Sequence, residues 1–341
     1  MSNAAYDILG IGNAIVDIVA PVDDVFLSRH AMHKGAMALV TAEQAAALTT
    51  AWPAGKQSSG GSGANTCAVA AGLGARVAYL GTVADDALGA AFRTDIVAAG
   101  VHFPSRPLKG GAPTARCLIA VTPDGQRTMN TFLGACVALG VDDLDEALIA
   151  ASAVTYLEGY LFDPPAAQAA FHRAVAVAHA AGRRVALTLS DPFCVNRHRA
   201  AFQALVRDGV DILFANEMEI TALYEENDFD AAARRAGQDV ALAVLTRSEA
   251  GSVIVHGTET IVIPAAPAQV VDTTGAGDAY AAGFLAAHAR GASLVICGQL
   301  ASLAAAAAIS AYGARPSGLA GLPAQAGLLP ATNEAARSFS P

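Results

Sequence analysis

The sequence predicts an α/β protein with a central, mainly parallel sheet. Short apolar runs of strand length alternate with alanine-rich stretches of helix length, which is typical of a parallel sheet covered by helices. Of the 341 residues, 54% are hydrophobic and only 15% are charged, so the chain can bury a large core. The formal net charge of −9 argues against a broad surface for nucleic acid or for an anionic membrane.

The apolar runs predict central strands that are buried on both faces, over residues 77–80, 153–157, 184–189, 212–214 and 241–245. Helices are expected between these strands, each ending at or near a glycine, over residues 63–73, 86–99 and 165–181. Asp85 or Asp86 is expected to cap the second of these helices. Prolines suit the first turn of the third.

Two segments interrupt this alternation. Pro123-Asp124-Gly125 is a turn sequence between residues 116–121 and 126–132, which predicts a hairpin and, with residues 8–40, a small accessory sheet. A second hairpin is predicted from residues 251–256 and 260–263, which a Gly-Thr-Glu turn separates.

The most apolar late segment, residues 300–312, is too short and too rich in alanine to span a bilayer, and we expect a buried helix there. Residues 1–17 contain no Lys or Arg and include Asp7 and Asp17, which is unlike a secretory signal. We therefore expect a cytoplasmic protein.

The five cysteines predict buried thiols rather than a disulfide framework or a zinc finger, because their number is odd and no C-x-x-C spacing occurs. The eight histidines are scattered, and only His30 and His33 lie close together in sequence. No metal site is assigned to the histidines.

The most informative string is VVDTTGAGDA, which begins at residue 270 and precedes a helical pattern. Gly275, Ala276 and Gly277 would expose backbone N–H groups where that helix begins, a suitable site for a phosphate. Asp278, in the first turn, is placed to accept a hydroxyl proton during phosphoryl transfer. The alternative is a tight turn in which Asp272 and Asp278 are helix caps, although the length of the string favours the specific interpretation.

This string resembles the C-terminal signature of the ribokinase-like carbohydrate and nucleoside kinases, the phosphofructokinase B family. Residues 60–65, GGSGAN, and the AAGLG run at 70–74 resemble the N-terminal signature of the same family. The matching motifs span residues 10–315 in the family's order. The resemblance implies an ATP-dependent phosphotransferase that uses Mg²⁺, with Asp278 as the base that activates the acceptor hydroxyl.

The resemblance also implies a ribokinase-like fold, with helices on both faces of the central sheet and a small β lid. A kinase domain is then expected over residues 1–325, with the lid formed approximately by residues 11–40 and 101–132. Residues 326–341 are expected to form a C-terminal tail.

Two N-terminal segments are implied to bind the acceptor. The resemblance makes Asn13 and Asp17 ribose-binding groups, and a carboxylate suits the two hydroxyls of a vicinal diol. Gly60 and Gly61 would let a substrate approach the backbone, and the Asn65 amide can both donate and accept hydrogen bonds. Without the resemblance, Asn13 is a loop residue, Asp17 a surface acid and Asn65 a helix cap.

Later segments resemble the family's contacts with nucleotide and magnesium. Asn216 and Glu219 match its Asn-x-x-Glu motif, which organises Mg²⁺ and its waters, while a helix cap with an exposed acid is the alternative. Ser248 stands where the family's Thr-x-Gly-x-x-Gly motif has its first glycine. The predicted nucleotide contacts are Asn216, Glu219, Thr246, Ser248, Gly251 and Thr274.

Within the family the chain is most similar to bacterial adenosine kinases, at residues 10–17, 129–135, 158–160 and 189–193. Tyr160 or Phe193 is predicted to stack on adenine, since a hexose would need more hydrogen-bonding groups, although each also suits a core. Arg127 is predicted either to reach the transferred phosphate or to remain solvated on its hairpin.

The expected reaction is transfer of the γ-phosphoryl of ATP to the ribose 5′-hydroxyl of adenosine, which yields AMP. A kinase for ribose, fructose or another nucleoside is the alternative. A non-catalytic binding protein on the same fold is disfavoured by the intact Asp278 and Gly-Ala-Gly. The only expected partner is a small-molecule substrate, for a monomer or a homodimer.

Overall fold

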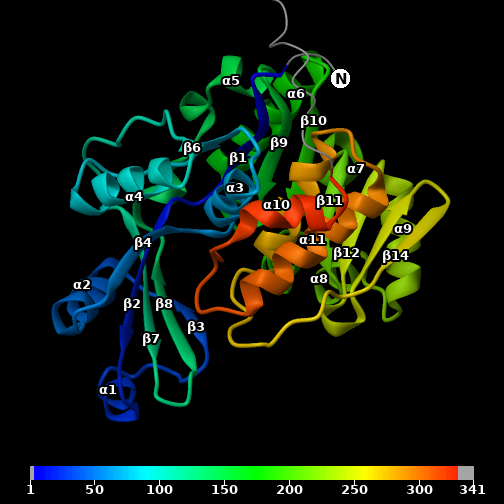
Figure 1. The fold of residues 1–341 in the computed structure, drawn as a ribbon. Coiled ribbons are helices and arrows are strands. Elements are labelled where there is room, and N and C mark those ends of the chain that lie inside the picture. Colours follow the sequence, from blue (N-terminus) through cyan, green and yellow to red (C-terminus); the bar gives the residue numbers. More distant parts are fainter. Residues whose placement is uncertain (1–3, 329–341) are drawn as a thin grey trace, which may run out of the picture.

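The structure is a computed structural model that describes residues 4–328 and contains two sheets of unequal size (Figure 1). The strands of the large sheet are, in spatial order, β14 (Glu259–Ile263), β13 (Ser252–His256), β12 (Leu242–Thr246), β11 (Ile212–Asn216), β10 (Arg184–Thr188), β9 (Ser152–Glu158), β1 (Tyr6–Ile11), β5 (Val77–Leu80) and β6 (Val101–His102). All neighbours are parallel except β12 with β13 and β13 with β14. The predicted mainly parallel α/β sheet is therefore confirmed.

Helices cover both faces of the large sheet. One face packs against α3 (Ser62–Gly72), α4 (Ala87–Ala98), α10 (Ala276–His288) and α11 (Leu294–Ile309). The other face packs against α5 (Glu146–Ala150), α6 (Pro165–Ala180), α7 (Pro192–Gly209), α8 (Glu217–Tyr224) and α9 (Phe229–Asp239). The short α12 (Leu322–Gln325) follows α11. Because both faces are covered, the central strands are apolar along nearly their whole length, as their sequences predict.

The small sheet projects from one end of the large sheet, at the lower left of Figure 1. Its strands, in spatial order, are β3 (Met37–Leu39), β8 (Arg127–Phe132), β7 (Ala115–Val121), β2 (Ile15–Pro21) and β4 (Lys56–Gly60). Two short helices, α1 (Asp24–Arg29) and α2 (Ala42–Ala51), accompany it. The predicted hairpin around Pro123-Asp124-Gly125 forms the antiparallel pair β7 and β8.

The predicted boundaries of the lid differ from the small sheet at two places. Residues 101–102, placed in the lid from sequence, form β6 at the edge of the large sheet. Residues 56–60 lie outside the predicted lid, yet β4 pairs with β2 along the other edge of the small sheet. The polar sequence KQSSG lacks the apolar run that predicts a strand, and its partner strand is what makes it β4. Of the predicted tail, residues 329–341 lie outside the described part of the chain.

The late apolar segment is a packed helix, α11, which lies against α10. The two backbones approach closely, since a Cβ atom on Gly283 would lie 2.7 Å from the Cα atom of Ala301. Among residues 4–328, none of the helices has the length and hydropathy to cross a membrane. All five cysteines are buried and unpaired, as predicted.

Candidate active site

The two sheets meet where the chain crosses between them. Residues 12–14 lead from β1 into β2, and Gly61 leads from β4 into α3. The two crossings touch, because a Cβ atom at Gly61 would lie 2.1 Å from the Asn13 carbonyl oxygen. Gly61 also has φ of +94°, so glycine is required there both sterically and conformationally. Five of the residues predicted to bind the acceptor gather at these crossings, and we name them the polar cluster: Asn13, Asp17, Gly60, Gly61 and Asn65.

The Asp17 side chain lies over Gly60, the last residue of β4. A Cβ atom on Gly60 would lie 2.3 Å from an Asp17 carboxylate oxygen, so only glycine leaves room for this side chain. Burial raises the pKa of Asp17 to about 6, and the nearby Arg315 and Arg127 guanidinium groups oppose that rise. Asp17 is therefore not the freely solvated surface acid of the alternative interpretation.

Glu158, at the end of β9, bonds to residues of the polar cluster and beside it. It was not predicted as a site residue from the sequence. Its carboxylate accepts hydrogen bonds from the Asn13 backbone N–H at 3.1 Å, from Asn13 Nδ2 at 2.9 Å and from the Gly63 N–H at 2.8 Å. Burial raises the pKa of Glu158 to about 7. Asn13 is itself buried, and its Oδ1 has no partner among the described residues, so this acceptor is available to a ligand.

Asp278 lies in the first turn of α10, which packs beside α3. The Ser62 hydroxyl donates to Asp278 Oδ1 at 2.6 Å. Burial raises the pKa of Asp278 to about 6, against hydrogen bonds from Ser62 and Asn65 and the charge of Arg315, which lower it. Asp278 is thus tied to the first residues of α3 rather than acting as a cap, and Gly275 is the N-cap of α10.

The start of α10 is open toward a ligand. No side chain caps this helix, and Gly275 turns the chain with φ of +75°. A Cβ atom on Gly277 would meet nothing within 4 Å among the described residues. The Ala276 N–H donates to the Thr273 carbonyl at 3.3 Å, whereas the Gly277 N–H has no partner among the described residues. An unpaired N–H in the first turn of a helix is a group that can bind phosphate.

The loop before α10 is braced by Asp272, which is buried. Asp272 accepts hydrogen bonds from Thr274 Oγ1 at 2.7 Å and from the Gly313 N–H at 2.9 Å, and it forms an ion pair with Arg127 of β8. Burial raises its pKa, but these hydrogen bonds hold the pKa of Asp272 below its usual range. The Arg127 side chain thus links the small sheet to this loop instead of remaining solvated, and the Thr274 hydroxyl serves the turn.

Tyr160 and Phe193 are both exposed, by 37% and 74%, which excludes the core interpretation for each. The Tyr160 N–H donates to Ser190 Oγ at 3.2 Å. This bond joins the segment of Tyr160 to the residues that lead into α7 and Phe193. Asp191 caps α7 by accepting from the Phe193 N–H at 2.6 Å.

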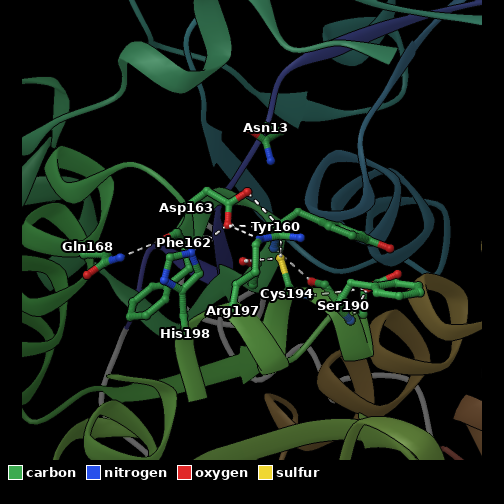
Figure 2. A network of polar contacts seen from close by, with 12 residues as sticks. Asn13, Tyr160, Phe162, Asp163, Gln168, Ser190, Cys194, Arg197 and His198 are labelled. Carbon is green, nitrogen blue, oxygen red and sulfur yellow. Dashed lines mark hydrogen bonds and ion pairs between the residues drawn. The ribbon is translucent and has the colours of Figure 1, made fainter. Parts of the chain in front are cut away.

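A group of charged side chains holds the same two segments together (Figure 2). Asp163 accepts from Arg197 Nη2 at 2.9 Å and contacts His198 Nε2 at 2.8 Å. His198 has φ of −126° and ψ of 24°, which is not helical, so residues 192–197 form a separate first turn of α7. Asp163 therefore fixes this turn, and with it Phe193, to the segment that carries Tyr160.

The predicted magnesium residues form the helix cap that sequence reasoning kept as the alternative. Asn216 caps α8 in a reciprocal capping box, in which Asn216 Oδ1 accepts from the Glu219 N–H and Glu219 Oε2 accepts from the Asn216 N–H, each at 2.9 Å. Asn216 Nδ2 also donates to Glu219 Oε1 at 2.6 Å. Glu219 is buried, rather than an exposed acid, and burial raises its pKa to about 7. No group of three or more His, Cys, Asp or Glu side chains within residues 4–328 is arranged to hold a metal ion. This donor set suits an ion that arrives with phosphate ligands of its own.

Thr246, Ser248 and Gly251 lie at the end of β12 and in the turn that follows. Ser248 adopts φ of +51°, a left-handed conformation that favours glycine. This backbone conformation explains why a glycine suits this position of the motif, and in this chain a serine adopts it.

Three contributors to the site escaped the sequence reasoning: Glu158, Ser62 and Arg315. Arg315 donates through Nε to Asn65 Oδ1 at 2.9 Å, across 250 positions of the chain. Glu158 lies within a segment already recognised as similar to the family, which was the available signal. Arg315 follows a helix in an irregular segment, where no periodicity points to its role.

Comparisons with known proteins identify the family of this chain and its fold. The model of the pfkB family carbohydrate kinases matches residues 37–319. Adenosine kinase from Sinorhizobium meliloti is 52% identical with a TM-score of 0.87, over 95% of this chain and 100% of that one. A probable sugar kinase from Rhizobium etli CFN 42 is 46% identical with a TM-score of 0.88, over 96% and 100%. ATP-dependent ribose-1-phosphate kinase from Halopiger xanaduensis is 34% identical over 239 residues, 68% of this chain and 73% of that protein.

The fold and the site define a phosphotransferase with an alcohol group as acceptor. The chain belongs to the pfkB family of carbohydrate kinases, with the ribokinase-like fold and the small sheet expected from its motifs. Kinases of this family use ATP.

Proposed function

We propose that the protein is an adenosine kinase, which transfers the γ-phosphoryl of ATP to the ribose 5′-hydroxyl of adenosine. The observation that carries this proposal is that two aromatic side chains, Tyr160 and Phe193, are exposed on segments joined by a hydrogen bond. The segment of Tyr160 follows directly after Glu158, which accepts hydrogen bonds from Asn13 of the polar cluster. A nucleoside combines a flat base with a vicinal diol, so aromatic faces and carboxylate or amide groups suit its two halves.

In the proposed reaction, Asp278 accepts the proton of the 5′-hydroxyl. The hydroxyl oxygen then forms a bond to the γ-phosphorus, the bond between that phosphorus and the bridging oxygen breaks, and ADP leaves. The turn formed by Gly275, Ala276 and Gly277 offers the backbone N–H groups of its two glycines to the transferred phosphoryl, and these offset its charge. Asp17 and Asn13, with Gly60, Gly61 and Asn65, hold the ribose in line with Asp278.

The second substrate in this proposal is ATP with its Mg²⁺. Magnesium neutralises phosphate charge and keeps most of its water ligands, so one buried acid near the phosphates is an adequate protein contribution. Asn216 and Glu219 would contact those waters, and Arg127 would lie beside the transferred group. Thr246, Ser248, Gly251 and Thr274 would line the path of the nucleotide.

The relatives support the acceptor to different degrees. The Sinorhizobium meliloti protein, similar over nearly the whole chain, is named an adenosine kinase, whereas the Rhizobium etli protein, at 46% identity, is named a probable sugar kinase. The second candidate is therefore a sugar kinase, or a kinase for another nucleoside, that uses the same phosphate machinery. A small molecule is the only partner proposed, for a monomer or a homodimer, which light scattering separates.

The deciding experiment measures ADP release with Mg-ATP against adenosine, inosine, guanosine, ribose, fructose and ribose 1-phosphate, with products identified by mass. We expect turnover with adenosine and formation of AMP. Preference for a free sugar or a sugar phosphate would overturn the acceptor while keeping the phosphotransfer. In the same assay, Phe193→Ala should raise KM for adenosine and leave KM for ATP nearly unchanged.

A further inference from the structure

Arg315 joins three elements of the site from a loop that follows α11. Its Nη1 donates to Ser59 Oγ of β4 at 2.7 Å and pairs with Asp95 of α4 at 3.2 Å, while its Nε donates to Asn65 of α3. The side chain is 21% exposed, and its buried Nη2 has no hydrogen-bond partner within residues 4–328. None of the nucleotide or acceptor roles proposed above uses this residue.

The bond to Asn65 has a directional consequence. A guanidinium only donates hydrogen bonds, so it selects the carbonyl end of the Asn65 amide and turns the NH₂ end away. A carboxylate accepts only, and the side chain of Asn65 lowers the pKa of Asp278 through a hydrogen bond. The Asn65 amide thus stands between a group that must donate and a group that must accept.

The Asp278 carboxylate is held from one helix. Ser62, the first residue of α3, donates to Asp278 Oδ1, and Asn65 lies one turn further along α3. Ser62 needs no outside partner to orient a hydroxyl, which rotates freely. An amide has two unlike ends, and Arg315 decides which end faces Asp278.

We propose that Arg315 is a positioning residue for phosphoryl transfer: it orients Asp278 through Asn65, and its guanidinium charge favours the ionised form of the Asp278 carboxylate. The inference rests on the proposed role of Asp278 as the base. Arg315 itself touches neither the transferred group nor the acceptor hydroxyl in this scheme.

The charges around Asp278 explain why one cation matters. The charge of Asp278 raises the pKa of three carboxylates on three elements, Asp17 on β2, Glu158 on β9 and Glu219 on α8, so negative charge gathers around it. Arg315 is the cation that lowers the pKa of Asp278. Replacing it with a neutral residue leaves the negative neighbours unopposed, so Asp278 becomes protonated at a higher pH.

The test compares kcat and KM between pH 5 and 9 for the wild type, Arg315→Gln, Arg315→Lys, Asn65→Ala and the double variant Arg315→Gln/Asn65→Ala. We expect Arg315→Gln to lower kcat at pH 7 by about tenfold or more and to move the acidic limb of the profile upward by roughly one pH unit. Arg315→Lys keeps the charge without the fork, so it should restore the acidic limb but only part of kcat.

The double variant separates a path through Asn65 from an independent effect. If Arg315 acts through Asn65, the two substitutions together cost little more in kcat than the worse of them alone. Multiplying effects, with an unmoved acidic limb, would overturn the proposal. Arg290→Gln is the matched control, since Arg290 donates to the Leu73 carbonyl at the opposite end of α3, and its profile should match the wild type.

Asp278→Asn distinguishes failure of this inference from failure of the proposed function. Full turnover in Asp278→Asn would remove the base assignment and the inference with it. An inactive Asp278→Asn beside an unchanged Arg315→Gln profile would remove the inference alone. Should Arg315→Gln not fold, as judged by circular dichroism, Arg315→Lys supplies the same comparison, with unchanged kcat as the contradicting result.

Discussion

At the scale of single residues, the site is built from carboxylates held in unlike ways. Asp272 is held ionised by the hydrogen bonds that it accepts, whereas burial raises the pKa of Asp278, Asp17 and Glu158. A base with a pKa of about 6 is largely ionised at neutral pH yet still accepts a proton effectively. The difference between these acids fits the bracing contacts of Asp272 and supports our proposal that Asp278 accepts the proton.

Asp278→Asn tests that assignment directly. An amide does not accept a proton, so we expect kcat to fall by about 10²–10⁴-fold, the usual contribution of a positioned base. Calorimetric binding of adenosine should stay within a few fold, because Asp17 and Asn13 remain. Ser62→Ala, which removes one donor to Asp278 without removing the base, is the control and should lose far less.

Glu158 gives a prediction about stability. Its pKa of about 7 in the folded protein exceeds the ordinary value of 4.5, so the folded state binds the proton more tightly than the unfolded state. Its ionisation therefore weakens the fold as pH rises from about 4.5 to about 7, and this loss is absent below that window. Glu158→Gln should flatten the pH dependence of the free energy of unfolding in that window.

The same substitution should alter binding. In Glu158→Gln the new amide would present an NH₂ group where the carboxylate now accepts from Asn13 Nδ2. The Asn13 amide must then turn over and offer a donor instead of its unpaired Oδ1. KM for the acceptor should rise while KM for ATP stays constant. Constant KM for both substrates would mean that Asn13 Oδ1 makes no hydrogen bond to the acceptor substrate.

At the scale of elements, the first turn of α7 is a separate unit because His198 leaves the helical conformation. Asp163 bonds Arg197 and His198 and so ties this turn to the segment that carries Tyr160 (Figure 2). The placement of Phe193 relative to Tyr160 therefore depends on Asp163, whose bonds are to Arg197 and His198.

Asp163→Ala should release this turn. We expect KM for adenosine to increase severalfold with a smaller change in kcat, since Asp278 lies on a different element. Glu146→Gln, which removes a comparable exposed partner of Arg173, should leave both constants unchanged. An equal rise in KM for ATP would show that Asp163 supports the whole site instead.

Sequence reasoning predicted elements better than contacts. The strands over 77–80 and 184–188 and the helices beginning at Ala87 and Pro165 follow from apolar runs, capping residues and prolines, which are local signals. Strand β4 did not follow, because its polar sequence becomes a strand only through pairing with β2. Arg315 did not follow for a similar reason: nothing near it in sequence records its contact with Asn65.

At the scale of the whole molecule, the small sheet is attached to the large one by backbone crossings and by charged side chains. Arg127 of β8 pairs with Asp272 beside α10, and both side chains are nearly buried, at 12% and 7% exposure. Removing one member of such a pair leaves a buried charge without its partner, which is costly.

Arg127→Met should loosen the small sheet relative to the rest. We expect faster amide hydrogen exchange in β7 and β8, a lower melting temperature and a lower kcat. Lys34→Met, which removes an exposed cation that pairs with Asp24 of α1 and Asp124 of the β7–β8 turn, should exchange like the wild type. Unchanged exchange in Arg127→Met would show that the backbone crossings alone hold the small sheet.

The order of strands in the large sheet also bears on how the protein is made. Strand β1 lies between β5 and β9, and the polar cluster beside it is completed by Arg315, close to the end of the described chain. During synthesis β1 must therefore wait for both of its neighbours, and Arg315 emerges after every residue of the polar cluster. A ribosome-bound chain that stops short of this loop would carry Asn13, Asp17 and Asn65 without Arg315, the residue that we propose to orient Asp278 through Asn65.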